Sequence, residues 1–308
     1  MTTLFYSHPD FLKHDTGLGH PESSERLQSI QQAISTAKLN PLKRIQAKIT
    51  EKTQQQIRLV HSQAHIDKVL QKIPADEFLF LDDDTIASTG SANAALLAVA
   101  AACDAVDKIC TQQADNAFCA SRPPGHHAEA NKVQGFCLFN NIAIAAEYAR
   151  QHYGIKRIAI VDFDVHHGNG TQAVFYQQKA VQYLSSHEMP NYPGTGYPTE
   201  TGVGNIVNVP LAPETTGKVF REKYQNIILP ALRAFKPELL LVSAGFDAHR
   251  DDPLSTIQLL EADYAWLGTE LIKIAKEYSQ GRLISVLEGG YHLEALANSV
   301  VSYLQAIK

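Results

Sequence analysis

The sequence predicts an α/β protein with a central parallel sheet. Short apolar runs rich in branched side chains are typical of buried strands, and we expect strands at residues 117–120, 157–163, 181–185, 205–209, 239–244 and 283–287. Longer segments with helical spacing lie between most of these runs. Residues that can do chemistry follow several of the runs directly. These three observations favour alternating strands and helices rather than an all-helical or all-β protein.

The helical segments are expected at residues 92–110, 141–152, 218–235, 261–278 and from 293 onward. Gly154 predicts the end of the second segment. The longest apolar run, residues 94–103, is bracketed by Asn93 and Asp104 and is shorter than the roughly 20 residues that span a bilayer. It is therefore expected to form a buried, alanine-rich helix. The alternation is typical of a doubly wound sheet with helices on both faces.

Composition indicates an ordinary globular protein. Hydrophobic residues make up 44% and charged residues 19% of the 308 residues, which excludes collagen-like, disordered and coiled-coil classes. The formal charge is −5, so no global positive field favours nucleic acid or an anionic membrane as a partner. We find no repeat and no linker, and expect one domain over residues 1–308.

The four cysteines never stand in a C-x-x-C spacing, and the first residues do not resemble a signal segment. Free thiols are typical of a reducing compartment. The sequence therefore predicts a cytoplasmic protein.

Residues able to do chemistry follow four of the predicted strands. The segments are 122–127, 162–170, 245–247 and 288–291, and they supply His, Asp and Tyr side chains. The carboxyl ends of parallel strands meet at one edge of a sheet, where the ligand crevice of an open α/β sheet lies. We therefore expect these segments to form one active-site rim.

The pattern Asp162-x-Asp164-x-His166 directs three metal-binding side chains to one face, because side chains alternate along an extended strand. Two close carboxylates repel unless a cation or hydrogen-bond donors compensate them. Asp164, His166 and Asp247 would form a three-ligand site with an open position, as in catalytic zinc sites. A solvated strand end is the alternative for the pattern alone, and Asp247 on a separate strand argues against it.

Two further features could act beside such a metal. The adjacent imidazoles of His126 and His127 can take a proton from metal-bound water and return one to a leaving group, although one of the two could be a buried structural histidine. Tyr291 follows two glycines, which allow a turn that aims the phenol inward to stabilise an oxyanion. Simple packing is the alternative for a lone tyrosine.

Motifs of several other enzyme classes do not occur in the sequence. It contains no G-x-S-x-G elbow, no G-x-x-x-x-G-K-[ST] phosphate loop, no H-E-x-x-H helix and no G-x-G-x-x-G turn. Serine hydrolase, P-loop and common dinucleotide-binding functions therefore lose their main support.

Six motifs together resemble the histone deacetylase superfamily, in particular its class II-like members, bacterial deacetylase-like amidohydrolases and acetylpolyamine amidohydrolases. In chain order they are Arg122-Pro-Pro-Gly-His-His, Gly135-Phe136-Cys137, Asp162-x-Asp164-x-His166-His167-Gly-Asn-Gly-Thr, Tyr192-Pro-Gly-Thr-Gly, Ala244-Gly-Phe-Asp247 and Glu288-Gly-Gly-Tyr291. The resemblance covers most of the chain from His20 to Tyr291. It implies an arginase-like α/β fold with a central, mainly parallel sheet flanked by helices, in one deacetylase-like catalytic domain.

The resemblance implies a role for each matched residue of the reaction centre. The metal ligands are Asp164, His166 and Asp247; the catalytic residues are His126, His127, Tyr291 as the oxyanion donor, and Asp162 behind the first imidazole. Asn169 matches the partner of His127, where class I members carry Asp, so we expect His127 to be less strongly held in its charged form. The implied ion is Zn²⁺, with Fe²⁺ or Mn²⁺ as alternatives that carboxylate ligation also suits.

Other matched residues concern the substrate and the structure. Gly135, Phe136 and Tyr192 match the walls of a narrow acyl-lysine channel. Asp84 resembles the rim carboxylate that accepts substrate amides, although it lies in a run of three Asp that could be a solvated loop. A structural K⁺ is implied at Asp162, Asp164, His166 and the main chain of Ser185 and Ser186. Arg26 resembles the arginine near an acetate-release cavity, with a helix-surface arginine as the alternative.

The implied activity is a zinc-dependent amidohydrolase that removes acetyl or other acyl groups from lysine side chains. Leu254 stands at a channel-mouth position where a polyamine-selective relative carries Glu, and a neutral side chain offers no anion to a polycation. Acylated lysine in peptides or proteins is therefore favoured over acetylated polyamines. A non-catalytic module that binds acylated ligands is a further alternative, and an arginase-like hydrolase would need more metal ligands. An oligomer is compatible with the sequence.

Overall fold

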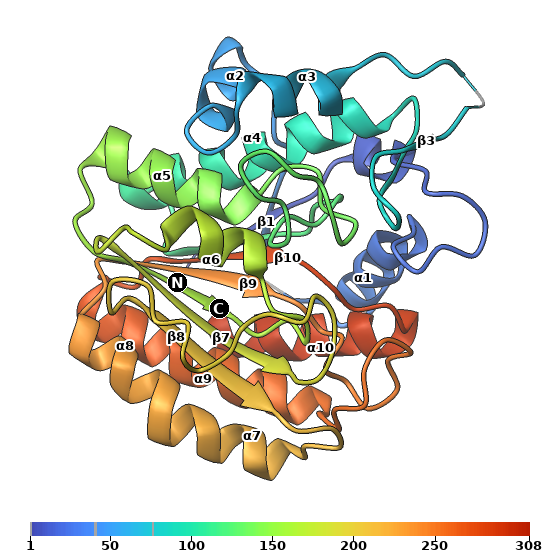
Figure 1. Cartoon of the computed structure of the whole chain (residues 1–308). Coiled ribbons are helices and arrows are strands. Elements are labelled where there is room, and N and C mark those ends of the chain that lie inside the picture. The colour runs from blue at the N-terminus through green and yellow to red at the C-terminus, as the bar shows by residue number, and fades with distance from the viewer. Residues whose placement is uncertain (1, 40–41, 76) are drawn as a thin grey trace.

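The computed structural model describes residues 2–39, 42–75 and 77–308 and contains an eight-stranded sheet between two helical layers (Figure 1). The strand order is β2-β1-β5-β10-β9-β6-β7-β8, and every neighbouring pair is parallel. The strands are β1 (Thr3–Tyr6), β2 (Leu42–Ile45), β5 (Asn116–Cys119), β6 (Ile158–Asp162), β7 (Val181–Glu188), β8 (Ile206–Leu211), β9 (Leu239–Ala244) and β10 (Leu283–Leu287). This arrangement confirms the predicted α/β fold.

Helices cover both faces of the sheet, as Figure 1 shows. One layer contains α1 (Glu25–Thr36), α7 (Gly217–Lys223), α8 (Leu229–Phe235), α9 (Glu261–Tyr278) and α10 (Leu293–Ile307). The other contains α2 (Glu51–Ile57), α3 (Gln63–Leu70), α4 (Ser91–Cys110), α5 (Asn141–Tyr153) and α6 (Asn169–Phe175). A short helix, η1 (Pro9–Lys13), packs against α4.

The central strands are apolar on both sides because each side meets a helical layer. In β6, Ala159 and Val161 face the core that includes α9 and α10, whereas Ile158 and Ile160 face the core of α4 and α5. All residues of β6, β9 and β10 are buried. Continuous apolar strands are typical of a parallel sheet covered on both faces, and this explains why the sequence showed runs rather than alternation.

Local signals explain where several helices begin and end. The Asn140 side chain accepts a hydrogen bond from the Ala143 N–H at the start of α5, and Gly154 ends that helix with a φ of 66°. The single helix expected at residues 218–235 consists of α7, a π-helical turn at Tyr224–Ile228 and α8. Among the described residues, no helix combines the length and apolar character that crossing a membrane would require.

The sequence reasoning missed elements of the N-terminal third. These are β1, β2, α1 to α3, and a small antiparallel hairpin of β3 (Leu79–Phe80) and β4 (Ile86–Ala87). Strand β2 reads Leu-Lys-Arg-Ile, and its two central side chains are exposed because it is an edge strand. Such a short, half-polar segment carries little signal, and charged residues are common on strands that end a sheet.

A buried cluster of charges ties this N-terminal region to the sheet. The Glu22 carboxylate accepts hydrogen bonds from the guanidinium groups of Arg122, at 2.5 and 2.8 Å, and Arg26, at 2.9 Å. All three residues are 0% exposed. Burial alone would raise the pKa of Glu22, but the Arg122 guanidinium and His14 hold it well below its usual range. One carboxylate thus balances two buried cations.

We expect Glu22→Gln to lower the free energy of unfolding by about 3–5 kcal/mol, because it leaves both guanidinium groups buried without a counter-charge. Urea denaturation followed by circular dichroism measures the change. Glu222→Gln, on an exposed position of α7, is the matched control and should shift stability by less than about 0.5 kcal/mol. Equal midpoints for the Glu22 variant and the wild type would contradict this account.

Candidate active site

The order of strands brings the chemistry-bearing segments together. Strands β5, β10, β9, β6 and β7 are consecutive neighbours in the sheet, and the segments that follow the first four carry the predicted site residues. Since all these strands are parallel, their carboxyl ends lie on the same edge. Segments that are far apart in sequence therefore form one buried site.

Three of these residues are placed to hold a metal ion. Ligand atoms of Asp164, His166 and Asp247 all lie within 4.8 Å of one another, and all three residues are buried. His166 Nδ1 lies 3.1 Å from Asp164 Oδ1 and 3.2 Å from Asp247 Oδ2. Two carboxylates and one imidazole form a donor set that divalent zinc, iron or manganese can accept.

The backbone holds both carboxylates in this position. Asp164 Oδ2 accepts from the Gly289 N–H at 2.7 Å, and Asp247 Oδ1 accepts from the Val165 N–H at 2.8 Å. A Cβ atom on Gly289 would lie 2.0 Å from Asp247 Oδ2, so only glycine fits there. Gly289 thus allows the backbone to approach the carboxylates of Asp164 and Asp247 closely.

The charges of the three candidate ligands are strongly coupled. Burial together with the neighbouring Asp164 charge raises the pKa of Asp247 to about 7. Burial opposes a charged imidazole at His166, but its contacts with Asp164 and Asp247 outweigh burial and raise its pKa to about 10. In the metal-free protein, the proton on His166 therefore balances part of the carboxylate charge.

His126 and His127 lie side by side next to these residues, with ring centroids 4.0 Å apart. His126 Nδ1 lies 3.0 Å from Asp162 Oδ2, which also accepts from the Tyr183 hydroxyl. Burial opposes charge on His126, but Asp164 and Asp162 outweigh it and raise the pKa of His126 to about 10. His126 is thus the imidazole that the site holds in its charged form.

His127 has a different partner and a different charge state. Its Nδ1 lies 2.9 Å from Asn169 Oδ1, and Asn169 Nδ2 donates to Glu129 at 3.0 Å. Because the amide oxygen of Asn169 can only accept, His127 carries its proton on Nδ1 and leaves Nε2 free as a base. Burial and the neighbouring His126 lower the pKa of His127 well below its usual value.

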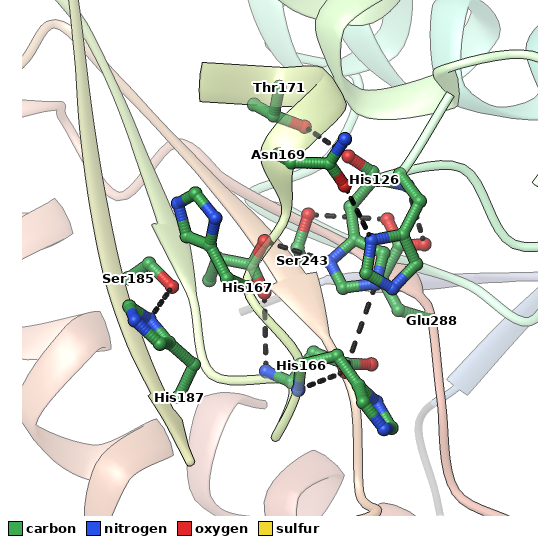
Figure 2. A network of polar contacts seen from close by, with 12 residues as sticks. His126, His166, His167, Asn169, Thr171, Ser185, His187, Ser243 and Glu288 are labelled. Atoms are coloured by element: carbon green, nitrogen blue, oxygen red, sulfur yellow. Dashed lines mark hydrogen bonds and ion pairs between the residues drawn. The ribbon is translucent and has the colours of Figure 1, made fainter. Parts of the chain in front are cut away.

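Glu288 is a site residue to which sequence reasoning gave no role. Its Oε2 accepts from the N–H groups of Gly125 at 2.7 Å and His126 at 3.1 Å, and its Oε1 accepts from the Ser243 hydroxyl at 3.2 Å (Figure 2). Burial raises its pKa to about 7, although His126 and the Gly125 N–H act in the opposite direction. Its place directly after β10, beside the glycine pair, was the available signal.

Tyr291 and Arg26 come together on the other side of the site. The Arg26 guanidinium lies 5.0 Å from the centre of the Tyr291 ring and donates to the carbonyl oxygens of Gly290 at 2.6 Å and Glu288 at 2.5 Å. Arg26 is buried, so the alternative of a surface arginine on a helix is wrong. The Phe136 ring lies 5.9 Å from the Tyr291 ring, edge to face.

The aromatic side chains expected to line the substrate opening, Phe136 and Tyr192, lie close to Tyr291 and to the imidazoles, and the expected opening is called the aromatic opening below. The Tyr192 ring lies 5.1 Å from the His127 ring and 6.3 Å from the His166 ring, and Phe136 packs on His20 at 4.8 Å. The carbonyl oxygen of Leu254 accepts from Asn191, the neighbour of Tyr192, at 3.4 Å. His20 is thus an aromatic neighbour of the opening that sequence reasoning had quoted only as a motif boundary.

Of the three consecutive aspartates, Asp84 is the one that reaches this opening. Its Oδ1 accepts from the Gly135 N–H at 3.1 Å and from the Thr85 hydroxyl at 2.8 Å, while Thr85 accepts from the Phe136 N–H. Its backbone carbonyl also contacts His20 at 3.4 Å. These contacts hold Asp84 beside the Gly135–Phe136 backbone, which is not the behaviour of a freely solvated loop.

The residues expected to hold a second cation are also neighbours. Asp162 on β6 stands opposite Ser185 on β7 in the sheet. The hydroxyls of Ser185 and Ser186 contact His187 and Tyr224, each at 2.9 Å. Both hydroxyls thus already have a hydrogen-bonding partner within the protein, and the potassium site stays a prediction.

Comparison with known proteins gives a consistent result. Residues 20–307 match the histone deacetylase domain. An uncharacterized protein of Synechocystis sp. is 42% identical over 100% of this chain and 99% of its own length. A probable deacetylase of Archaeoglobus fulgidus is 36% identical, with 96% of this chain and 82% of that protein aligned. Histone deacetylase 14 of Arabidopsis thaliana, a chloroplastic protein, is also 36% identical, over 99% of this chain and 76% of its own.

A solved structure agrees with these relatives. The crystal structure of the HDA15 HD domain superposes with a TM-score of 0.93 at 36% identity, covering 99% of this chain and 88% of that one. The similarity thus includes the whole sheet and the edge that carries the candidate site. The chain belongs to the histone deacetylase family and is a deacetylase, a hydrolase of acylated substrates.

Proposed function

We propose that this protein is a zinc-dependent lysine deacylase that acts on peptides or proteins. The observation that carries the proposal is that Asp164, His166 and Asp247 meet beside the paired imidazoles, with the Tyr192 ring packed against His127. The proposal treats residues 1–308 as one catalytic domain organised by the eight-stranded sheet. It gives each metal ligand and catalytic residue the role that the resemblance to the histone deacetylase superfamily implies.

The donor set fits a divalent ion. Asp164 and Asp247 are buried carboxylates whose mutual repulsion raises the pKa of Asp247, and a cation between them would relieve that repulsion. Zinc bound by Asp164, His166 and Asp247 would polarise the acyl carbonyl and lower the pKa of a water molecule toward about 7. Fe²⁺ and Mn²⁺ suit the same ligands. A structural K⁺ near Asp162, Asp164, His166, Ser185 and Ser186 belongs to the proposal as well.

The side chains divide the proton transfers according to their charge states. His127, with Nε2 free, accepts the proton of the attacking water. His126, hydrogen-bonded to Asp162, supplies a proton to the departing amine. The Tyr291 hydroxyl donates a hydrogen bond to the oxyanion that develops on the acyl carbonyl. The proposed division follows from the different partners of the two imidazoles, Asp162 for His126 and Asn169 for His127.

The opening supports an acyl-lysine substrate. Phe136 and Tyr192 provide flat apolar walls for an extended lysine stem, with the Gly135 backbone beside them. Asp84 stands at the rim, where a carboxylate can accept the backbone amides of a peptide. The neutral side chain of Leu254 places no negative charge at the mouth of the opening. A polycationic substrate would therefore find no ion-pair partner at that position. An acetylated polyamine remains the second candidate, because acidic residues elsewhere could attract it.

The wider setting follows the same reasoning. Nucleic acid and membranes are not proposed as partners, given the net charge of −5, and association with further copies of the chain is compatible with the proposal. All four cysteines are free thiols, of which Cys103, Cys119 and Cys137 are buried. We propose a reducing compartment, the cytoplasm, on that ground.

The first test measures metal content together with turnover of a fluorogenic acetyl-lysine peptide and of N-acetylspermidine. Faster turnover of the peptide would support the proposal, and faster turnover of the polyamine would overturn its substrate. We expect Tyr291→Phe to lower kcat about 10²- to 10³-fold with unchanged metal content, because it removes one oxyanion donor. Tyr197→Phe, at an exposed tyrosine, is the control. Full activity of the Tyr291 variant would exclude the oxyanion role.

Metal binding is expected to release protons. At pH 7 the metal-free protein keeps a proton on His166, whose pKa is about 10, and a metal ion bound at that imidazole must displace it. The apparent affinity for zinc should therefore rise with pH from 6 to 9, roughly in step with loss of that proton.

Calorimetric titration with Zn²⁺ in buffers of different ionisation enthalpy measures the protons released. His166→Asn should bind zinc more weakly and release fewer protons. A binding enthalpy that does not depend on the buffer would contradict the charge assignment.

We expect Leu254→Glu to raise the ratio of N-acetylspermidine to acetyl-lysine turnover, because a carboxylate at the mouth attracts the distal amines of a polyamine. Leu254→Gln has a similar shape without the charge and should leave the ratio near that of the wild type. The ratio of kcat/KM values at low and high salt gives the readout. An unchanged ratio in the Glu variant would remove the argument from the mouth of the opening.

A further inference from the structure

Asp252 is a buried carboxylate that the proposed chemistry does not use. It is 6% exposed, and among the described residues it forms no ion pair with a lysine, arginine or histidine. It accepts hydrogen bonds from backbone N–H groups only. Such a residue costs desolvation energy, so its retention in the interior calls for a reason.

The backbone N–H groups that donate hydrogen bonds to Asp252 belong to two loops of the site. Asp252 Oδ2 accepts from the N–H of Tyr291 at 2.7 Å and of His292 at 3.2 Å. Asp252 Oδ1 accepts from the N–H of Leu254 at 3.0 Å. One carboxylate therefore joins the loop after β10 to the loop after β9 at the point where each carries a site residue.

The segment before Tyr291 gives this contact its importance. Gly290 has a φ of +121°, a conformation that L side chains rarely adopt, so the turn into Tyr291 depends on glycine, the residue whose own backbone is least restricted. Arg26 fixes this segment through the carbonyl oxygens of Glu288 and Gly290. Asp252 fixes it through the N–H groups that follow. Opposite charges thus hold the two sides of the same short turn.

We propose that Asp252 is a positioning residue that sets where the Tyr291 hydroxyl stands relative to the metal ligands. It acts through the Tyr291 and His292 backbone and contacts no reacting atom. This inference rests on the proposed function, because it concerns the oxyanion role of Tyr291. Through Leu254 N, the same carboxylate also fixes the mouth of the opening relative to its base.

The test is a double-mutant cycle between Asp252→Asn and Tyr291→Phe, measured as kcat and KM on the acetyl-lysine peptide with the metal-loaded protein. An asparagine has one acceptor oxygen and one NH₂ group. It can therefore accept hydrogen bonds from only one of the two loops, and its NH₂ group would face an N–H donor of the other loop. We expect kcat to fall about 10- to 100-fold with little change in KM, as a small misplacement of a catalytic group can cause. Asp251→Asn, the exposed neighbour, is the matched control.

The decisive readout is the additivity of the two changes. If Asp252 acts through the tyrosine hydroxyl, Asp252→Asn should add little to the loss already caused by Tyr291→Phe. Losses that multiply, or an unchanged kcat in Asp252→Asn, would overturn the inference. If Tyr291→Phe alone costs nothing, the proposed oxyanion role fails instead. Should the Asn variant not fold, Asp252→Glu, which keeps two acceptor oxygens at a different reach, enters the same cycle with the same criteria.

Discussion

The burial of like charges at one edge of the sheet is the constraint on which the site depends. Asp162, Asp164, Asp247 and Glu288 are all 0% exposed and lie at the end of, or directly after, the neighbouring strands β6, β9 and β10. Backbone N–H groups and imidazoles compensate them in the metal-free protein. This compensation is asymmetric, because one imidazole faces a carboxylate and its neighbour faces an amide. The chemistry of the paired histidines is thus a product of how the protein neutralises its own interior.

A second layer of charge supports the first from the N-terminal region. Glu22 neutralises Arg122 and Arg26, and Arg26 in turn holds the carbonyl oxygens of the turn that carries Tyr291. Arg122 stands four residues before His126 and is fastened to the same carboxylate. Glu22 and Arg26, which lie outside the sheet, therefore help to fix the position of the Tyr291 turn at its edge.

Much of the site could be predicted because its residues directly follow strands. The apolar runs before Asp162, Asp247 and Tyr291 require only local sequence and the rules of parallel sheets. The expected alternation does not continue past Asp162, where β6 ends, and Asp164 and His166 lie in the bend that follows. The supporting contacts of Asp252, Glu288 and Glu22 could not be predicted, because each joins loops far apart in the chain. Strand β2 was missed for another reason: the edge of the sheet leaves Lys43 and Arg44 exposed, so the segment lacks an apolar run.

The strand order has a consequence for how the protein emerges from the ribosome. Strands β9 and β10, which come late in the chain, separate β5 from β6 within the sheet. The nascent segments with β1, β2 and β5 therefore cannot join those with β6 to β8 until residues 239–287 have been made. Asp164 and His166 are therefore synthesised well before Asp247, the third candidate ligand. The three candidate metal ligands thus come together only after residues 239–247 have been added, and a chain interrupted before them would expose unpaired strand edges to aggregation.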